Sequence, residues 1–367
     1  MTSPLGELLS QLVAIPSVSG SEAGAAAACL AHLANAGIDA EIAGGGVLAR
    51  LEMGRGPRLM LASHLDTVPP GEGWTRDPYA ARWEDGRLVG RGANDAKASA
   101  AAMLWTVLEI AKAPWRGPKG EIWLALNACE ETTNSGMAAV LERTGKPDGA
   151  VVGEPTGLEV VRAQGGLAVI EARWCGFSCH AAHVSRVEHA NALLAAAREL
   201  ARLPAWLELP GDHPLLGKST VVPTLLRAGE RHNVVPDRAE ALFDARIAPP
   251  HRAGEVAALL AGRLPEAVVS VRSERLQPVE TLADHPLVRA ALACAGKAAA
   301  IGSSTLSDMA LLSGVPAIKC GPGRTERSHV PDEFVLESEL AAGAAFYRDF
   351  VPAALEALAH VPEEAKR

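Results

Sequence analysis

The chain has 367 residues, of which 48% are hydrophobic and 21% are charged, and its formal net charge is −8 at pH 7. The composition is that of an ordinary globular protein, and the length predicts roughly two domains of about 150 residues each. The negative charge and the lack of a Lys/Arg cluster argue against a protein that binds nucleic acid.

The cysteines and the N-terminal segment favour a cytoplasmic protein. Six scattered cysteines without a CxxC pair predict free thiols rather than disulfides or a structural metal site. The segment Met1–Gln11 has no basic region and contains Glu7, which does not fit a secretory signal. No uninterrupted apolar run approaches the roughly 20 residues that a membrane span needs. We therefore expect a cytoplasmic location and no membrane partner.

Short apolar runs alternate with longer helical patterns along the chain, which predicts α/β layers with a largely parallel sheet. Helices are expected over Leu5–Ile15, Ser21–Ala36, Lys97–Ala113, Ala190–Leu203, Ala253–Leu264 and Glu337–Leu358. Proline removes a helical hydrogen bond, so the last of these is expected to be kinked or broken at Pro352. Strands are expected over Arg58–Ser63, Glu121–Ala128, Ala150–Val152, Leu167–Trp174, Ala239–Ile247 and Val315–Lys319.

The pattern changes near residue 163, where two strand–helix units follow one another, and the earlier alternation resumes from residue 285. The simplest architecture is an α/β catalytic domain with a mostly parallel sheet, formed by residues 1–162 and 276–367. An α+β domain over residues 163–275 would be inserted into it.

Four of the expected strands run into a histidine or a carboxylate. The side chains at these positions are His64 and Asp66, Glu130 and Glu131, Glu154, and, a few residues after its strand, His329. In open α/β sheets, ligands bind at the carboxyl ends of the strands. One acid after a strand is commonplace, but four converging groups of this kind predict a functional site.

A turn-rich segment, Gly90–Lys97, opens the helix that begins at Lys97. Asp95 stands where a GxGxxG pattern would need glycine, and the chain has no Walker sequence, so we expect no nucleotide site here. Taken alone, Asp95 is compatible with a helix cap as well as with a ligand.

Five motifs in the chain together resemble the M20 metallopeptidase family, and in particular its acetylornithine deacetylase and succinyl-diaminopimelate desuccinylase branch. They are HLDTVP (64–69), GRGANDAK (90–97), EE (130–131), GEPT (153–156) and CGPG…SHVPDEF (320–334). They occur in the order of the family, so the resemblance covers essentially the whole chain. It implies a zinc-hydrolase catalytic domain with an inserted lid and dimerisation domain.

The resemblance implies two divalent metal ions, zinc with cobalt as the alternative, held by His64, Asp95, Glu131, Glu154 and His329. Asp95 would bridge the two ions, with His64 and Glu154 at one and Glu131 and His329 at the other. Histidine nitrogens and carboxylate oxygens without thiolates also suit a catalytic zinc site. Two such ions, about 3.5–4 Å apart, polarise a carbonyl and lower the pKa of a bridging water.

Two further residues are assigned to the chemistry by the resemblance. Asp66 would orient the imidazole of His64. Glu130 would be the general base that takes a proton from water and passes it to the leaving amine. This requires a turn or bulge that directs Glu130 and Glu131 to different partners, and the alternative is a pair of solvated loop acids.

The inserted domain carries further matches. The segment around His180 resembles the family segment whose histidine reaches across a dimer into the other active site, which implies a homodimer. His180 would bind the substrate carbonyl or the oxyanion formed from it, and Asn233 would contact the intermediate. Arg246 is a candidate clamp on the substrate α-carboxylate, or else a charge on a strand surface. Weaker candidates for the substrate pocket are Gly321, Gly323, Thr305 and Ser307.

The expected function is therefore hydrolysis of the amide bond of a small N-acyl amino acid. N-acetylornithine is the first candidate, with acetylcitrulline and acetyl-lysine close to it. A succinyl-diaminopimelate desuccinylase comes next, although no extra cation for the succinyl carboxylate can be identified, followed by a dipeptidase or carboxypeptidase. A non-catalytic metal-binding scaffold of the same fold is the alternative from another class, and the presence of all five candidate ligands and Glu130 argues against it. The inserted domain is expected to close as a lid.

Overall fold

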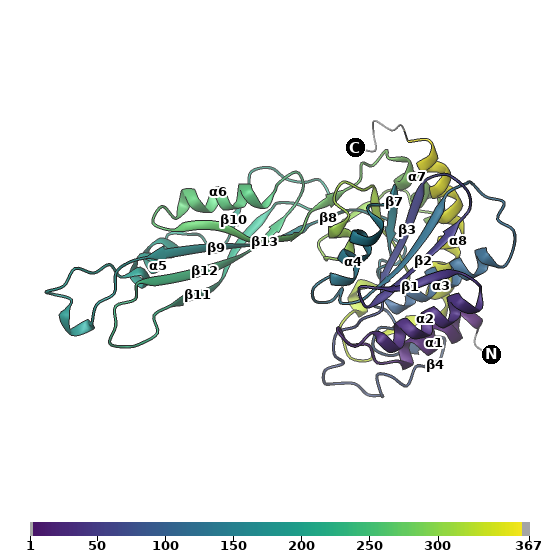
Figure 1. Cartoon of the computed structure of the whole chain (residues 1–367), viewed down its shortest axis with the longest axis horizontal. Helices are drawn as coiled ribbons and strands as arrows, with labels where there is room; N and C mark the ends of the chain where they lie inside the picture. The colour runs from purple at the N-terminus through teal and green to yellow at the C-terminus, as the bar shows by residue number, and fades with distance from the viewer. Residues whose placement is uncertain (1–2, 362–367) are drawn as a thin grey trace. The chain divides into compact units, whose positions relative to one another are not determined.

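The structure is a computed structural model that describes residues 3–361, so the outermost residues of the predicted catalytic domain (1–2 and 362–367) lie outside it. The chain forms two compact units (Figure 1). The first comprises the described parts of Met1–Ala163, Glu280–Gly302 and Ser307–Arg367, and the second comprises Gln164–Val279 and Ser303–Leu306. None of the described helices is long and apolar enough to cross a membrane.

The first unit is built on a mixed sheet with the strand order β1-β2-β6-β3-β7-β16-β8-β14, with β15 (Ile301–Ser303) paired to β8. Its strands are β1 (Asp39–Ala43), β2 (Gly46–Glu52), β6 (Glu121–Asn127), β3 (Arg58–His64), β7 (Gly149–Val152), β16 (Ala317–Lys319), β8 (Val161–Gln164) and β14 (Val279–Glu280). The four central strands β6, β3, β7 and β16 are parallel, which confirms the predicted fold class. The flanking β1 and β2 are antiparallel.

Six α-helices in the first unit are α1 (Pro4–Ala14), α2 (Ala23–Asn35), α3 (Lys97–Ala111), α4 (Ser135–Thr144), α7 (Pro286–Ala295) and α8 (Glu337–Ala359). Their apolar side chains form one core with the sheet, made largely of Ala, Leu and Val. The central strand β3 is buried along nearly its whole length, as expected for a parallel strand covered on both faces. A small sheet of β4 (Arg82–Glu84), β5 (Arg87–Val89) and β17 (Phe334–Leu336) lies apart from the main one.

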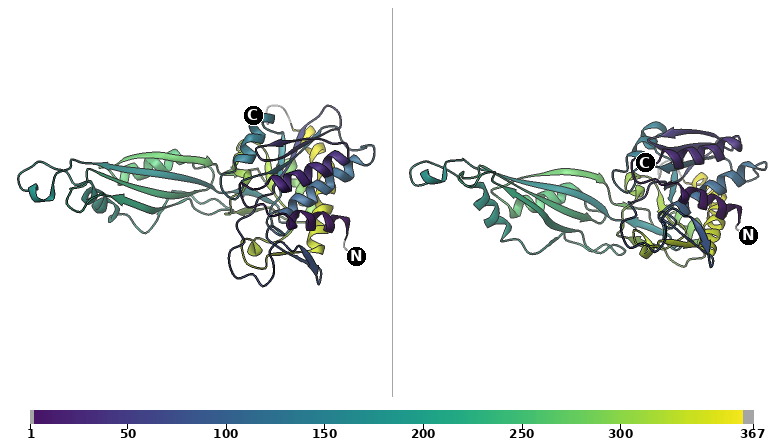
Figure 2. Two further views of the ribbon diagram at one scale, coloured as in Figure 1. Left: turned by 60° about the horizontal axis from the view of Figure 1, so that its bottom comes forward. Right: turned by 90° about the horizontal axis from the view of Figure 1, so that it is seen from below.

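The second unit is an antiparallel sheet with two helices. Its strand order is β10 (Leu207–Glu208), β11 (Thr220–Ala228), β12 (Arg238–Ile247), β9 (Gly166–Cys175) and β13 (Val268–Leu276), seen side by side in Figures 1 and 2. Helices α5 (Ala192–Leu200) and α6 (Ala253–Arg263) share a second core with alternate residues of these strands, such as Phe243. This alternation is typical of a sheet covered on one face.

Of the two alternatives at Pro352, a kink or a break, the break is wrong, because α8 is a single helix with Pro352 inside it, while the kink stays a prediction. Phe350 and Val351 on one side of the proline and Ala354 and Leu355 on the other are all buried in the same core. Packing of both halves offsets the hydrogen bond that proline removes.

Several elements had no counterpart in the sequence prediction, among them the hairpin of β1 and β2 and helix α4. The hairpin turn places Gly44 and Gly45 at φ angles of 56° and 85°, a region that glycine adopts without strain. The Gly-Gly pair was the available signal for this hairpin.

Lys97, the first residue of α3, is fully buried and ties this helix to α1. Its Nζ atom donates hydrogen bonds to the main-chain oxygens of Leu12 and Ile15, each at 2.9 Å. These carbonyls lie at the C-terminal end of α1, where a positive charge is favoured. Burial lowers the pKa of Lys97 to about 8.

Replacing Lys97 by Met should therefore lower the free energy of unfolding by roughly 1–3 kcal/mol, because two buried carbonyl groups lose their donor. Lys112→Met is the matched control, since Lys112 caps the other end of α3 and its side chain is 62% exposed. We expect it to change stability by less than about 0.5 kcal/mol. Urea unfolding followed by circular dichroism measures both, and equal midpoints would contradict the role given to Lys97.

Candidate metal centre

The five predicted metal ligands all belong to the first unit. His64 is the last residue of β3, Glu131 follows β6, and Glu154 follows β7. Because these three strands are parallel neighbours, their carboxyl ends meet at one edge of the sheet. Asp95 lies in the loop before α3, and His329 lies in the loop before β17.

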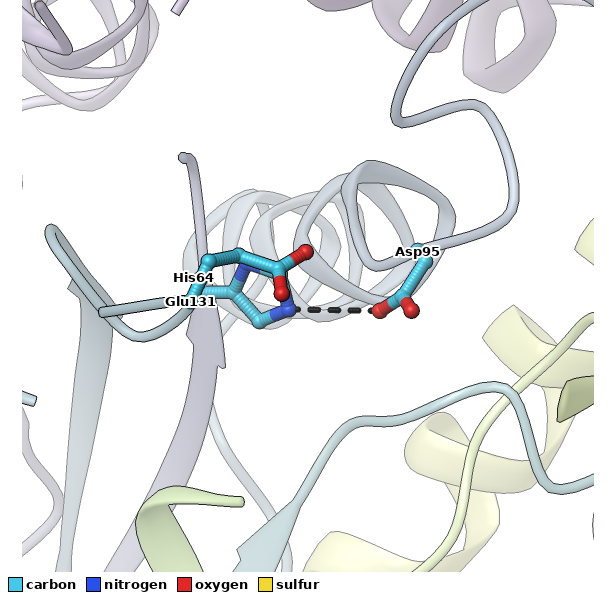
Figure 3. Close-up of side chains that lie close together, drawn as sticks. All are labelled: His64, Asp95 and Glu131. Atoms are coloured by element: carbon cyan, nitrogen blue, oxygen red, sulfur yellow. Dashed lines mark ion pairs between the residues drawn. The ribbon is translucent and has the colours of Figure 1, made fainter. Parts of the chain in front are cut away.

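Asp95 lies between the two histidines. Its Oδ1 atom is 3.3 Å from His64 Nε2, the contact drawn in Figure 3, and its Oδ2 atom is 3.4 Å from His329 Nε2. The Nε2 atom of His329 is also 3.0 Å from Glu131 Oε1. Candidate ligand atoms of His64, Asp95 and Glu131 all lie within 4.8 Å of one another. A carboxylate with one oxygen toward each histidine has the arrangement of a bridging ligand.

Glu154 contributes a carboxylate oxygen that is buried and has no hydrogen-bond partner among the described residues. Burial raises the pKa of Glu154 to about 8, and the charges of Asp95 and Glu131 act in the same direction. A buried acceptor without a partner is costly, and a cation is the kind of group that would satisfy it. The donor set of this site therefore fits divalent metal ions.

The two histidines respond to the acids around them. Burial disfavours the charged form of His64, but the hydrogen bond to Asp95 and the nearby acids outweigh it, so its pKa lies well above 6.5. The hydrogen bond to Glu131 raises the pKa of His329, which is half exposed. Burial acts to raise the pKa of Asp95, but the hydrogen bond between Asp95 and His64 outweighs it, so the pKa of Asp95 is lowered.

Asp66 contacts His64 through its main chain and, at a longer distance, through its carboxylate. The Nδ1 atom of His64 lies 2.9 Å from the main-chain oxygen of Asp66, whereas the Asp66 carboxylate is 3.6 Å away. That carboxylate accepts the N–H groups of Glu130 and Glu131, at 3.0 and 3.1 Å, and the hydroxyl of Ser19 at 2.7 Å. The main chain of Asp66 thus orients His64, and its side chain holds the two glutamates.

The turn that separates the two glutamates is present. Cys129 follows β6 with a φ angle of 56°, in the left-handed region, and its carbonyl accepts the N–H groups of Thr133 and Asn134. Glu131 faces His329, as described above. Burial raises the pKa of Glu130 well above its usual value, and the charges of Glu154 and Asp308 act in the same direction against that of His64.

Three buried charged residues near the site were not singled out from the sequence: Asp308, Lys319 and Glu333. The carboxylate of Asp308 accepts hydrogen bonds from Asn127 at 2.7 Å and Asn134 at 3.0 Å, and burial raises its pKa to about 6. Burial lowers the pKa of Lys319 against the charges of Glu154, Glu130 and Asp95. Lys319 directly precedes the motif CGPG…SHVPDEF (320–334), and Glu333 lies within it. This motif was the signal in the sequence that could have pointed to both residues.

In the second unit, His180 and Asn233 lie together. The side-chain Nδ2 of Asn233 is 3.4 Å from His180 Nε2, while His180 Nδ1 accepts the N–H of Ala182 at 3.1 Å. Arg246 is 55% exposed and forms two parallel hydrogen bonds with Asp244, at 2.8 and 3.2 Å.

The remaining candidates are engaged within the chain. The hydroxyl of Thr305, which belongs to the second unit, is 2.7 Å from that of Ser303, and the hydroxyl of Ser307 accepts the N–H of Met309. Gly321 donates its N–H to Thr156 and accepts the N–H of Leu158.

Steric constraints account for both predicted glycines. A Cβ atom on Gly321 would lie 2.4 Å from Ser99 Oγ and 2.7 Å from the main-chain oxygen of Glu154. A Cβ atom on Gly323, whose φ angle is 86°, would lie 2.4 Å from Asn94 Oδ1. Their contact with a substrate remains a prediction.

Comparison with known proteins agrees with this fold. Peptidase family M20/M25/M40 matches residues 60–353. Acetylornithine deacetylase of Erwinia tasmaniensis is 30% identical over 308 residues, 79% of this chain and 78% of that protein. Succinyl-diaminopimelate desuccinylase of Zymomonas mobilis is 30% identical over 268 residues, 68% of this chain and 69% of that protein.

Solved structures support the fold alone, since their sequence identities are low. Aminopeptidase PepT from Bacillus cereus superimposes with a TM-score of 0.73 at 20% identity, over 95% of this chain and 98% of that one. A dinuclear metal binding peptidase of family M20 from Bacillus subtilis gives a TM-score of 0.72 at 18% identity, over 96% and 98%. The sequence relatives and this fold define a hydrolytic enzyme of the metallopeptidase and amidohydrolase class. The chain belongs to peptidase family M20/M25/M40.

Replacing Glu154 by Gln should change the pH dependence of stability in metal-free protein. The pKa of Glu154 is raised from 4.5 to about 8 in the folded chain. Between these values the folded state holds a proton that the unfolded state has lost, so the free energy of unfolding falls as pH rises. The slope from this group is at most about 1.4 kcal/mol per pH unit.

Glu154→Gln removes this slope, so the variant should gain stability relative to the unaltered chain as the pH rises from about 5 to about 9. Urea unfolding across this range measures the difference. Glu159→Gln, at a partly exposed position of the same loop, is the control and should leave the pH dependence unchanged. The prediction is wrong if Glu154→Gln and the control follow the same curve.

Proposed function

We propose that this protein hydrolyses the amide bond of an N-acyl amino acid with the aid of two divalent metal ions, and that N-acetylornithine is its first candidate substrate. The observation that carries the proposal is the carboxylate of Asp95 between His64 and His329, with Glu131 beside it. Acetylcitrulline and acetyl-lysine are close alternatives. The acetylornithine deacetylases among the relatives, at about 30% identity, support this choice of substrate class.

The metal ions would be held by the five predicted ligands, with Asp95 shared between them. Nitrogen and oxygen donors without sulfur suit zinc, and cobalt accepts the same set. When bound, such ions polarise a carbonyl group and lower the pKa of water. The unpartnered oxygen of Glu154 supports this assignment independently of the bridging geometry.

Glu130 is the proposed general base. Its N–H is held by Asp66, and burial raises its pKa, which makes the carboxylate a better proton acceptor than an exposed glutamate. Glu130 would take the proton of the attacking water and deliver it to the nitrogen of the leaving amine. Its neighbour Glu131 faces His329 and is therefore proposed as a ligand.

We propose substrate-binding roles for three residues of the second unit, which would act as a lid. His180 would bind the carbonyl oxygen or the oxyanion formed from it, and Asn233 beside it would contact the same group. The guanidinium of Arg246 would bind the α-carboxylate, exchanging Asp244 for the substrate.

We also propose a homodimer. The second unit exposes several large apolar side chains, which is typical of a contact surface: Phe177, Leu193, Leu194, Leu226 and Val234.

The second candidate is a succinyl-diaminopimelate desuccinylase, because one relative with that name is as similar to this chain as the deacetylases are. A dipeptidase or carboxypeptidase follows. These activities differ in the acyl group or in the leaving amine, and not in the residues proposed for the metal centre.

A panel of N-acyl amino acids tests the proposal directly. It contains acetylornithine, acetylcitrulline, acetyl-lysine, acetylmethionine, succinyl-diaminopimelate and a few dipeptides, and amine release is measured on metal-stripped protein with and without added zinc or cobalt. We expect metal-dependent cleavage of one acetylated amino acid. Cleavage of the succinyl compound alone would favour the desuccinylase, and cleavage of nothing by protein with two bound metals would contradict the proposal.

Glu130→Gln should lower turnover by roughly 10²–10⁴-fold while metal content stays the same, because the variant loses the base but no ligand. Glu142→Gln, on the exposed side of α4, is the control and should turn over normally. Metal analysis and initial rates decide the outcome, and unchanged turnover would remove Glu130 from the mechanism.

Arg246→Ala should raise KM for substrates with a free α-carboxylate by roughly tenfold or more, since charged hydrogen bonds are lost. Arg238→Ala is the control on the same strand and the same outward-facing side of β12. The KM of a substrate whose α-carboxylate is converted to an amide should be the same in all three proteins. Equal KM values for the acid substrate in both variants would contradict the clamp.

A further inference from the structure

Two segments far apart in the sequence, residues 90–95 and 324–333, lie alongside each other and carry Asp95 and His329. The strands that flank them, β5 and β17, pair antiparallel, with Phe334 opposite Val89. The N–H of Gly90 donates to the main-chain oxygen of Glu333 at 2.9 Å, which extends this pairing. Beyond that point the two segments are joined by side chains.

The side chain of Glu333 holds the main chain of the first segment. Its Oε1 atom accepts the N–H groups of Asn94 and Asp95, both at 2.9 Å. The direction of the Asp95 peptide, and with it the position of the Asp95 carboxylate, is therefore set by a residue that lies four positions after His329.

A buried ion pair fixes the carboxylate of Glu333 itself. Its Oε2 atom is 2.6 Å from Nη1 of Arg91, and neither side chain is more than 2% exposed. Arg91 also donates from Nη2 to the main-chain oxygen of Pro70 at 3.0 Å. The ion pair and the hydrogen bond to Pro70 hold the Arg91 guanidinium in place, and removal of one partner of a buried charge pair leaves the other uncompensated.

Asn94 makes the reverse connection, from the first segment to the main chain of the second. Its side-chain oxygen accepts the N–H of Arg324 at 2.8 Å, and its side-chain nitrogen donates to the carbonyl of Arg324 at 3.0 Å and to Ser328 Oγ at 3.2 Å. Ser328 directly precedes His329. Gly323 leaves the space that the Asn94 side chain occupies.

We propose that Asn94 and Glu333 are positioning residues that form a reciprocal clamp between these segments and thereby set the affinity of one of the two metal sites, the one composed of Asp95, Glu131 and His329. This inference rests on the proposed function. Each of these two residues binds the main chain of the opposite segment near a candidate ligand. Asn94 and Glu333 together therefore set the distance between Asp95 and His329.

The clamp should act mainly on this one site because the other histidine is held by different means. His64 is 1% exposed and ends a central strand, so sheet hydrogen bonds and core packing fix it. His329 is 50% exposed in a loop, with a φ angle of 62°, and its ring contacts the carboxylates of Asp95 and Glu131. Its position therefore depends on the segment that Asn94 and Glu333 hold.

The test uses the full chain, stripped of metal and titrated with zinc, in the variants Asn94→Ala and Glu333→Gln. Asp148→Asn is the matched control, because Asp148 Oδ2 likewise accepts a main-chain N–H, that of Arg58 at 2.8 Å, and pairs with the guanidinium of the same residue at 3.3 Å. That contact lies at the start of β3, at the opposite end of the strand from His64. Calorimetry and metal content after equilibrium dialysis report both binding events.

We expect the unaltered chain and Asp148→Asn to bind two zinc ions. Asn94→Ala and Glu333→Gln should bind the first ion normally and the second roughly 10–100-fold more weakly, the usual effect of losing a residue that orients a ligand. Raising the zinc concentration until the second site fills should restore the turnover of Asn94→Ala, and it should not restore that of Glu130→Gln. Circular dichroism confirms folding, and if Glu333→Gln does not fold, Asn94→Ala decides.

The outcomes separate this inference from the proposed function. Two ions bound with unchanged affinity in both variants, or equal weakening of both ions, would overturn the clamp and leave the hydrolase proposal standing. Selective loss of the second ion, in a protein that cleaves no member of the substrate panel, would support the clamp and overturn the substrate proposal. Fewer than two ions bound by the unaltered chain would overturn both.

Discussion

The carboxylates of Glu130, Glu131 and Glu154 are crowded around Asp95, and each makes ionisation of the others less favourable. Burial and mutual repulsion raise the pKa of Glu130 and Glu154, so these groups resist ionisation together, while His64 and, for Glu154, Lys319 act in the opposite direction. Such an arrangement is unfavourable as part of a core and useful as a cation site. The surrounding fold has to hold these acids in place against their own repulsion.

The fold does this in two ways that differ in rigidity. Parallel strands deliver His64, Glu131 and Glu154 to one edge of the sheet, where their main-chain positions follow from the register of β3, β6 and β7. Asp95 and His329 come from loops, which a sheet cannot position. Buried polar contacts between the two loops hold them in place instead. We therefore propose that the site of Asp95, Glu131 and His329 depends on Asn94 and Glu333, whereas His64 depends on the sheet.

The second unit contributes a different kind of group. Its core is built like that of any one-sided antiparallel sheet, and its interest lies in the exposed side chains, a histidine paired with an asparagine and an arginine paired with an aspartate. Each is held by a neighbour: His180 contacts the N–H of Ala182 and the side chain of Asn233, and Arg246 makes two hydrogen bonds to the carboxylate of Asp244. The reactive acids and the proposed recognition groups are thus kept on separate units.

The fold class, the family and the strands that lead to His64, Glu131 and Glu154 could be predicted from the sequence, because they follow from local periodicity and motif order. The three-dimensional contacts show that Pro352 is accommodated within one helix, and that the Asp66 carboxylate binds the main chain of the glutamate turn besides pairing with His64. They also show that Asn94 and Glu333 join the two loops. Each of these depends on contacts between residues far apart in the chain, and such contacts have no periodicity, spacing or composition by which a single sequence could reveal them.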